Sequence, residues 1–226
     1  MEKLRRLHND AKKDLIVRNV HKGQLVLDVG CGRGGDLHKY KGTGCILMGI
    51  DPDAESVQEA NKRAQECDYT SWSKFYVGDI TNVNDGQFDV VCFNFSLQYT
   101  FIDEKTLDAT VEALTKLVKR GGKFIGVVPD ASRILRLPEQ WSDRMGNSVE
   151  RGPSIKYSPK IGNMILVKLA DGPYYAKGAI PEPLCYMDIL IDKLKNAFEL
   201  EEWSSMIKTP QGTISDIYSR FIFRRM

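Results

Sequence analysis

Short apolar runs alternate with helical patterns of apolar residues along the first 130 residues of the chain, and this rhythm constrains the fold most. The run over residues 24–29, for example, ends in glycines and leads into a helical stretch. Strands that are buried on both faces of a parallel sheet read in this way, because helices cover both sides of the sheet. The alternation predicts strands at residues 24–29, 45–50, 74–78, 88–95 and 124–128.

Helices are expected before and between these strands. Apolar residues at helical spacing predict a first helix over residues 4–15, and a short second helix should start at residues 36–37. A third helix over residues 54–64 has Asp53 as its expected N-cap. A fourth helix, over residues 107–118, is predicted to stop at Gly121 and Gly122, with the next strand directly after them.

The pattern loosens after Pro129 and then resumes. Residues 138–181 hold glycines, prolines and short strand-like pieces, which predict an inserted hairpin or lid. A helix over residues 187–198, a strand near residues 201–203 and a strand over residues 217–223 follow. We therefore predict an α/β fold with a seven-stranded, mostly parallel sheet and helices on both faces. Residues 1–226 should form one domain, with a core at 20–130 and 184–226 and an inserted part at about 131–183.

Composition excludes several classes of protein. Hydrophobic residues make up 42% and charged residues 27%, which is ordinary for a globular chain, and no apolar run approaches the roughly 20 residues of a membrane helix. Five irregularly spaced cysteines and a start without a secretory signal predict a reducing, cytoplasmic location. The net charge of +2, from 32 basic and 30 acidic residues, argues against a broad surface for long nucleic acid.

A glycine loop connects the first strand to the second helix, and it is the strongest local signal in the chain. Gly30, Gly32 and Gly35 match the dinucleotide pattern Gly-x-Gly-x-x-Gly, and Asp51 lies near the distance expected for a ribose-binding carboxylate. Asp28, two residues before the first glycine, favours a different ligand. An anionic side chain would repel a pyrophosphate at the start of the helix and attract a cation. From these residues alone, NAD stays an alternative.

Asp28 and the glycines after it also form the pattern Asp-x-Gly-x-Gly-x-Gly, which resembles the cofactor motif of class I S-adenosylmethionine-dependent methyltransferases. The residues that carry the pattern are Asp28, Gly30, Gly32 and Gly34. The resemblance implies a Rossmann-like methyltransferase fold, with S-adenosyl-L-methionine as the cofactor and S-adenosyl-L-homocysteine as its product. The sulfonium of this cofactor is the kind of cation that Asp28 would attract.

The same resemblance assigns cofactor contacts to residues at the ends of the next strands. It implies that Asp51 accepts hydrogen bonds from the ribose hydroxyls. Asp79 would contact the adenine amine, and Ile80, the next residue, belongs to the same contact. Asn94 would lie against the cofactor. Each aspartate alone could be a turn cap, but three in order after a glycine loop point to one ligand. Asp36 is expected to be only a helix cap.

The segment after the fourth strand narrows the family. It lacks the Asn-Pro-Pro-Tyr signature of enzymes that methylate exocyclic base amines and has a Phe-x-x-x-Tyr segment at residues 95–99. Together with residues 33–37, this segment resembles the mRNA cap guanine-N7 methyltransferases, and the resemblance spans nearly the whole chain. That family's first helix carries Asn-x-x-Lys, matched here by Asn9 and Lys12. The match implies that Lys12 binds the methionine carboxylate of the cofactor and that Asn9 belongs to the cap-binding side.

The resemblance also implies a pocket for the cap guanine. Gln98 and Tyr99 would face the base, and Tyr218 would be a second aromatic side chain against it. Glu182 would read the Watson–Crick edge, because guanine presents two adjacent donors, N1–H and N2–H, to a carboxylate. Tyr99, Glu182 and Tyr218 would act by positioning the base. The chain departs from the family at Gln98, where the family usually has a histidine. Glutamine can still form hydrogen bonds, but it cannot carry a positive charge.

Two arginines complete the predicted site, which needs no catalytic base. Arg33 and Arg63 match positions where the family places basic groups toward the cap triphosphate. Guanine N7 has an in-plane lone pair and no proton, so in-line attack on the sulfonium methyl group requires no general base. The histidines His8, His21 and His38 lie outside the predicted strand-end loops, and neither a metal site nor covalent catalysis is expected.

Other functions stay open at this stage. The chain could be a methyltransferase of another small molecule or protein, an NAD-dependent oxidoreductase, or a cap-binding module without catalysis. Among cap methyltransferases it most resembles the methyltransferase domain of multifunctional capping enzymes of large cytoplasmic DNA viruses, as in asfarviruses. That resemblance implies 5′-capped mRNA as the partner, a monomer, no membrane association, and triphosphatase and guanylyltransferase domains on the same chain.

Overall fold

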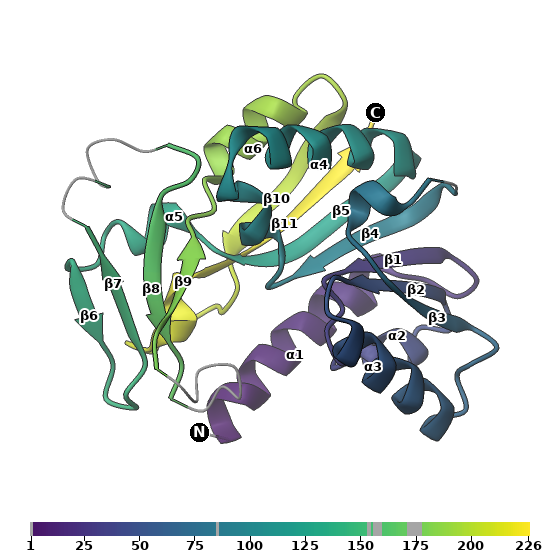
Figure 1. The fold of residues 1–226 in the computed structure, drawn as a ribbon, viewed down its shortest axis with the longest axis horizontal. Helices are drawn as coiled ribbons and strands as arrows, with labels where there is room; N and C mark the ends of the chain where they lie inside the picture. Colours follow the sequence, from purple (N-terminus) through teal and green to yellow (C-terminus); the bar gives the residue numbers. More distant parts are fainter. Residues whose placement is uncertain (1, 85, 153–154, 156–159, 171–177) are drawn as a thin grey trace.

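A seven-stranded sheet forms the centre of the computed structural model, which describes residues 2–84, 86–152, 155, 160–170 and 178–226 (Figure 1). Its strands are β1 (Leu25–Val29), β2 (Ile46–Asp51), β3 (Ser73–Val77), β4 (Phe88–Asn94), β5 (Val118–Pro129), β10 (Phe198–Ser205) and β11 (Tyr218–Arg225). Their order in the sheet is β10-β11-β5-β4-β1-β2-β3. Strands β1 to β5 run parallel, whereas β11 is antiparallel to β5 and β10 to β11. The predicted seven-stranded, mostly parallel sheet is confirmed.

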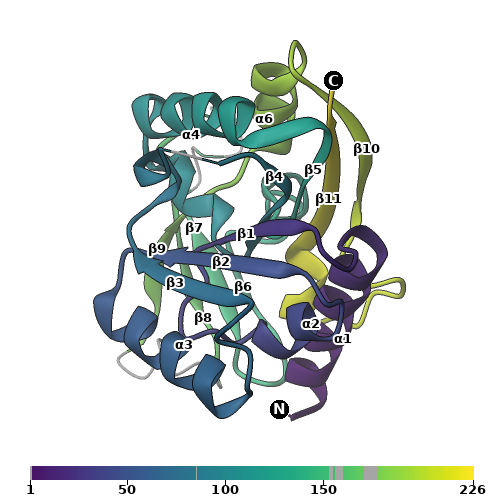
Figure 2. The same ribbon diagram turned by 90° about the vertical axis from the view of Figure 1, so that its right-hand side faces the viewer.

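Helices cover both faces of this sheet, as the alternation predicts. They are α1 (Glu2–Asn19), α2 (Leu37–Lys41), α3 (Ala54–Glu66), α4 (Glu104–Leu117), α5 (Ala131–Ile134) and α6 (Met187–Leu194), with 3-10 helices η1 (Ile80–Asn82), η2 (Leu97–Ile102) and η5 (Ile214–Ile217). Helices α4 and α6 lie on one side of the sheet and α1, α2 and α3 on the other (Figure 1, Figure 2). Asp53 caps α3 through the N–H of Ser56, which confirms its predicted role.

The strand interiors are apolar because both faces of the sheet are covered. Residues 90–93 of β4 are all buried, with at most 1% of each exposed. Polar residues appear instead near the carboxyl ends of the strands, with Asp28 in β1, Asp51 in β2 and Asn94 in β4. The side of the sheet where the strands have their carboxyl ends is therefore a polar edge, and parallel sheets bind ligands there.

The fourth helix ends earlier than the sequence pattern predicts. Helix α4 stops at Leu117 and β5 begins at once with Val118, so the expected stop at Gly121 and Gly122 is wrong. The glycines lie inside β5, where Gly121 has a φ of +76°. A Cβ at Gly122 would lie 2.9 Å from the carbonyl oxygen of Asp89 in the neighbouring strand. Glycine at position 122 therefore allows β5 to lie close to β4, and it does not end a helix.

A second sheet stands where a hairpin or lid was expected. Its antiparallel strands, paired in chain order, are β6 (Gln140–Ser142), β7 (Ser148–Arg151), β8 (Met164–Lys168) and β9 (Ile180–Pro183). Strand β9 packs on η2, so this sheet adjoins the polar edge of the large sheet (Figure 1). Strand β8 confirms one of the predicted strand-like pieces, at residues 164–167. Strands β6, β7 and β9, of three or four residues, carry too little alternation to be read from the sequence. The predicted division of the chain into core and insertion stays a prediction.

Candidate active site

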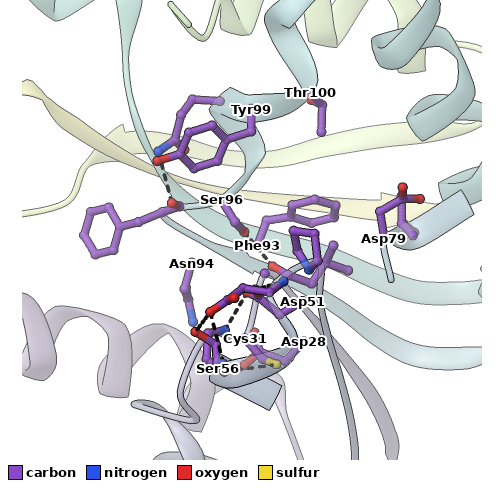
Figure 3. Close-up of a pocket in the computed structure, with 18 of the residues that line it drawn as sticks. Asp28, Cys31, Asp51, Ser56, Asp79, Phe93, Asn94, Ser96, Tyr99 and Thr100 are labelled. Atoms are coloured by element: carbon purple, nitrogen blue, oxygen red, sulfur yellow. Dashed lines mark hydrogen bonds between the residues drawn. The ribbon is translucent and has the colours of Figure 1, made fainter. Parts of the chain in front are cut away.

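A cavity of about 1370 Å³ lies at the carboxyl ends of strands β1 to β4, and it has two halves. The glycine-loop half is lined by Lys12, Asp28, Gly30, Gly32, Asp51, Asp79, Ile80 and Asn94. The aromatic half is lined by His8, Phe95, Gln98, Tyr99, Glu182 and Tyr218. In Figure 3, Asp28 and Asp51 lie together on one side of Ser96, and Tyr99 lies on the other. The fold thus brings the predicted cofactor residues and the predicted guanine residues into one cavity.

Gly30 brings the glycine loop close to the segment after β4. Its φ is +72°, and a Cβ there would lie 2.4 Å from the Cβ of Ser96. The N–H groups of Gly30 and Cys31 both donate to the carbonyl oxygen of Ile50, at 2.8 and 3.0 Å, which holds the loop against the end of β2. Only glycine meets both the backbone conformation and the spacing at this position.

Asp51 and Asp79 line the cavity and also bind backbone N–H groups. The Asp51 carboxylate accepts hydrogen bonds from the N–H of Gly32 at 2.8 Å and from the N–H of Asp53 at 3.0 Å. Asp79 accepts from the N–H of Thr81 at 2.8 Å and caps η1. Each aspartate therefore shapes its own loop and presents a carboxylate at the cavity.

Asp28 is buried beneath the glycine loop. Only 5% of it is exposed. Burial, and next the nearby Asp36 carboxylate, raise the pKa of Asp28 to about 7. A positively charged ligand would stabilise the ionised form of such a buried acid, and an anionic ligand would oppose it. The charge pattern therefore favours a cationic group over a pyrophosphate.

Asp36 binds two lysines and does not cap its helix. It stands at the N-cap of α2, but its side chain makes no capping hydrogen bond. Its Oδ1 lies 2.7 Å from the Nζ atoms of Lys12 and Lys39, and its Oδ2 accepts a hydrogen bond from Nδ2 of Asn94 at 3.1 Å. Burial raises the pKa of Asp36, but the two ammonium groups outweigh burial and hold it below its usual value. The expectation of a simple helix cap is wrong, because α1 brings Lys12 to this carboxylate.

Three rings pack together in the aromatic half, and two of their three contacts are edge to face. The centroids of Phe95 and Tyr218 are 4.9 Å apart at 79°, and those of His8 and Tyr218 are 5.4 Å apart at 81°. Phe95 has a φ of +62°, an uncommon conformation for a bulky residue. Burial, and next the Glu182 carboxylate, raise the pKa of Tyr218, so its phenol stays protonated and neutral.

A buried carboxylate stands beside a buried amide in the same half. Glu182 and Gln98 are 5% and 3% exposed. Nε2 of Gln98 donates to the carbonyl oxygen of Phe95 at 3.0 Å and to Oε2 of Glu182 at 3.4 Å. Oε1 of Gln98 is buried and has no hydrogen-bond partner among the described residues. The pair therefore offers buried acceptor oxygens to a ligand that carries N–H donors.

The predicted phosphate ligands line the cavity, and Asn9 is not among the lining residues that the structure describes. Arg33 and Arg63 both line it, and Nε of Arg63 also pairs with Glu59 on α3 at 2.9 Å. Asn9 is exposed and accepts a hydrogen bond from Nζ of Lys39 at 3.1 Å. The roles of these three residues in cap binding stay predictions.

His8 is one of the cavity residues that the sequence analysis did not assign to the site. It lies in α1, outside the strand-end loops as predicted, yet it lines the cavity, and its Nε2 lies 2.7 Å from Oγ of Ser215. Burial, and next the charge of Lys12, lower the pKa of His8 to about 4. Its position four residues before Lys12, on the same helix face, was the available signal. In the described part of the chain, no three His, Cys, Asp or Glu side chains gather as metal ligands.

Solved structures of methyltransferases share this fold. The CcbJ methyltransferase from Streptomyces caelestis superposes over 96% of both chains, with a TM-score of 0.69 at 13% identity. The glycopeptide N-methyltransferase MtfA, solved in complex with S-adenosyl-L-methionine, is matched over 96% of this chain and 93% of that one, with a TM-score of 0.65 at 13% identity. The fold is therefore that of class I S-adenosylmethionine-dependent methyltransferases.

Sequence comparison gives the family within this class. The family model for the mRNA (guanine-N(7))-methyltransferase domain matches residues 1–201. The chain is 33% identical over 196 residues to the mRNA cap guanine-N(7) methyltransferase of Candida glabrata, which is 80% of this chain and 44% of that protein. It is 33% identical over 187 residues to the Caenorhabditis elegans enzyme, over 76% of this chain and 47% of that protein.

The chain belongs to the mRNA (guanine-N7)-methyltransferase family, as its motifs predict. Members of this family use S-adenosyl-L-methionine, so the predicted cofactor is confirmed and the NAD alternative is wrong. The chain spans less than half the length of the two relatives described above, at 44% and 47%.

Proposed function

We propose that this chain transfers a methyl group from S-adenosyl-L-methionine to N7 of the guanine at the 5′ cap of mRNA. The observation that carries the proposal is one cavity lined both by the buried carboxylate of Glu182 and by the cofactor motif around Asp28 and Asp51. A buried carboxylate among aromatic rings suits a flat base with two adjacent N–H donors. Guanine is the common base that has them.

The glycine-loop half fits S-adenosyl-L-methionine. Asp51 would accept hydrogen bonds from the ribose hydroxyls, and Asp79 with Ile80 would hold the adenine. Oδ1 of Asn94 is buried and accepts no hydrogen bond from the described residues. It would therefore accept one from the cofactor's ammonium group, while Lys12 would bind the cofactor's carboxylate. When bound, the cofactor supplies an electrophilic methyl group and leaves as S-adenosyl-L-homocysteine.

The aromatic half would hold the guanine by its edge and its faces. Glu182 would accept hydrogen bonds from N1–H and N2–H, and Oε1 of Gln98, which lacks a partner among the described residues, would accept another from the base. Tyr99 at the rim and Tyr218 in the interior would lie against the ring. Stacking of a base on an aromatic side chain is worth about 1–3 kcal/mol. These contacts would leave N7 oriented toward the methyl group.

The transfer requires no acid or base from the chain, because N7 attacks with a free lone pair. Burial and the Lys12 charge lower the pKa of His8 to about 4, so the imidazole is neutral near pH 7, and it is bonded to Ser215. We assign the rate enhancement to alignment of N7 with the methyl carbon. Alignment of this kind can supply as much as about 7–11 kcal/mol.

The capped RNA would be held by its tip. Arg33 and Arg63 line the cavity, where guanidinium groups suit the oxygens of the cap triphosphate. The net charge of +2 does not support a surface that coats a long RNA. A 5′-capped mRNA end is therefore the proposed partner.

The remaining parts of the proposal rest on the resemblance to viral capping enzymes. They are a viral, multifunctional chain with triphosphatase and guanylyltransferase domains, action in the cytoplasm, RNA binding and a monomeric state. None of the helices in the described ranges is long and apolar enough to cross a membrane.

Methyl transfer to a cap dinucleotide tests the proposed function. The chain is incubated with isotope-labelled S-adenosyl-L-methionine and GpppA, and the methylated atom is identified by mass spectrometry after digestion. We expect N7-methylguanosine from GpppA and no product from ApppA. A methyl group on any other atom of the dinucleotide, or no transfer to GpppA at all, would contradict the proposal and favour a different methyl acceptor.

A further inference from the structure

One turn of α1 borders both halves of the cavity. His8 lines the aromatic half and Lys12 lines the glycine-loop half. Residues four positions apart are neighbours on one helix face. Nζ of Lys12 lies 2.7 Å from Oδ1 of Asp36 and 5.6 Å from the centroid of the Phe95 ring. A shift of this turn would therefore move side chains in both halves of the cavity.

His8 links this turn to the segment that carries Tyr218. Its Nε2 lies 2.7 Å from Oγ of Ser215 in η5, and Tyr218 begins β11 directly after η5. The His8 and Tyr218 rings also pack edge to face, with their centroids 5.4 Å apart. Ser215 is fully buried, so water does not compete for this hydrogen bond. His8 thus connects Tyr218 and the η5 turn before it to α1.

The η5 turn is built by residues other than His8. The Asp216 carboxylate accepts a hydrogen bond from the N–H of Gly212 at 2.7 Å. The N–H of Ile214 donates to Oδ2 of Asp143 at 3.1 Å. Loss of the His8 hydrogen bond should therefore leave the turn itself intact and loosen its contact with α1.

We propose that His8 is a positioning residue that sets Tyr218 for the guanine, and that the turn of α1 from His8 to Lys12 couples cofactor binding to cap binding. The inference rests on the proposed function, which places the guanine against Tyr218. Binding of the cofactor's carboxylate by Lys12 would hold α1 in place, and His8 on the same helix would then hold Tyr218 in place in the aromatic half. Coupling of this kind is reciprocal, so each ligand should tighten the binding of the other by the same factor.

The neutral state of His8 permits a clean substitution. Burial and the Lys12 charge lower the pKa of His8 to about 4, so near pH 7 its ring contributes a hydrogen bond and an edge contact without charge. His8→Phe keeps a ring and removes the hydrogen bond. Ser215→Ala removes the same hydrogen bond from the other side. His21, which is exposed and lies two residues after the end of α1, provides the control His21→Phe.

Calorimetry tests the inference by measuring GpppA binding with and without saturating S-adenosyl-L-homocysteine, for the whole chain and each variant. In the wild type, the homocysteine product should tighten GpppA binding. His8→Phe and Ser215→Ala should each weaken GpppA binding by about threefold to tenfold, the value of one hydrogen bond, and should reduce the tightening. The double variant should lose no more than either single variant, and His21→Phe should match the wild type.

Other results separate the inference from the proposed function. If the wild type binds GpppA but His8→Phe and Ser215→Ala bind it equally well, or if their losses add in the double variant, the inference is wrong and the proposed function stands. If the wild type does not bind GpppA, both are wrong. Should His8→Phe fail to fold by circular dichroism, Ser215→Ala alone gives the same comparison.

Discussion

The glycine-loop half and the aromatic half of the cavity differ in how the chain assembles them. Asp28, Asp51 and Asp79 reach one place because they lie at or just after the ends of β1, β2 and β3, which are neighbours in one parallel sheet. The aromatic half instead joins α1, η2, β9 and η5 with β11. Gln98 and Glu182, which share a hydrogen bond there, are 84 positions apart. Strand pairing fixes the first half, whereas packing between distant segments fixes the second.

This difference separates the two tasks of the proposed reaction. A half built from strand ends keeps its geometry as long as the sheet folds, so it suits a cofactor that is the same in every member of the class. A half built from an insertion and the chain ends can change without disturbing the sheet, so it suits an acceptor that varies. Substitutions should therefore affect one ligand at a time, except at α1.

The largest effect is expected from Asp51→Ala, which removes a carboxylate of the glycine-loop half. Two hydrogen bonds to a charged acceptor are worth about 1.5–3 kcal/mol each, so affinity for S-adenosyl-L-homocysteine should fall about 100-fold or more. Calorimetry measures this affinity, and GpppA binding by the free variant should stay within about twofold. The exposed Asp192 on α6 provides the control Asp192→Ala. An equal loss for both ligands would show that the two halves are not separate.

Tyr99→Ala, in the aromatic half, should have a smaller effect, and this effect should fall on GpppA binding and not on cofactor binding. Loss of one stacked base contact, about 1–3 kcal/mol, should weaken GpppA binding about tenfold without change in S-adenosyl-L-homocysteine binding. Tyr99→Phe should keep most of the affinity. Tyr76→Ala is a matched control, because Tyr76 is about as exposed as Tyr99, at 46% against 50%, but lies on β3. Full GpppA affinity in Tyr99→Ala would mean that the guanine does not lie against this ring.

A pH-dependent effect on stability is expected at Asp28. Its pKa is about 7 in the folded chain against 3.8 for the ordinary group, so the folded state holds an extra proton between these pH values. The free energy of unfolding should therefore fall as pH rises through this window. Asp28→Asn has no carboxyl group to ionise, so its free energy of unfolding should not fall in this way. Without ligand, the variant should melt a few degrees above the wild type at pH 8, since each kcal/mol of stability shifts the melting temperature by about 2–4 °C.

The same comparison at pH 4 and at a second aspartate checks the cause. At pH 4 the difference between Asp28→Asn and the wild type should shrink, because Asp28 is protonated in the folded chain. Asp68→Asn, at an exposed aspartate, should show no such trend. A melting temperature that is lower for Asp28→Asn at pH 8 would mean that the ionised Asp28 stabilises the free chain.

The smallest effect is expected in the salt dependence of binding to a short capped RNA. Two arginine–phosphate contacts allow a slope of log K against log salt no steeper than about −1.4, at about 0.7 per contact on a single strand. Arg33→Ala should reduce the slope by about 0.7. Fluorescence anisotropy between about 50 and 200 mM salt measures it. A slope near −4 would indicate a broad RNA-binding surface outside the cavity.

The strands of the large sheet and the glycine loop could be predicted because their signals are local in the sequence, whereas the cofactor contacts of Asp51, Asp79, Asn94 and Lys12 were implied by the family resemblance. Asp28 with the glycines that follow it occupies a few consecutive positions, and β1 to β4 each carry their own apolar pattern. Asp53 as the cap of α3 follows the same logic. In such cases the sequence neighbours of a residue are also its spatial neighbours.

Residues whose partners are distant in sequence could not be placed in this way. Asp36 reads as a helix cap until α1 brings Lys12 to within 2.7 Å of it. His8 reads as a helix-surface residue until η5 brings Ser215 against it, 207 positions further along the chain. Gly121 and Gly122 of β5 resemble a helix stop in the sequence, because the carbonyl oxygen of Asp89, which leaves no room for a Cβ at Gly122, lies on another strand. Glu182 was placed by family resemblance alone.

The most direct test is the effect of Glu182→Ala on each half, measured by single-turnover methyl transfer to GpppA and by S-adenosyl-L-homocysteine binding. If Glu182 reads the guanine, kcat/KM for GpppA should fall by about 100-fold while the S-adenosyl-L-homocysteine affinity stays within about twofold. Glu150→Ala, at an exposed glutamate on β7, should behave as the wild type. Unchanged N7 transfer by Glu182→Ala, or an equal fall in kcat/KM for GpppA and in affinity for S-adenosyl-L-homocysteine, would contradict the account.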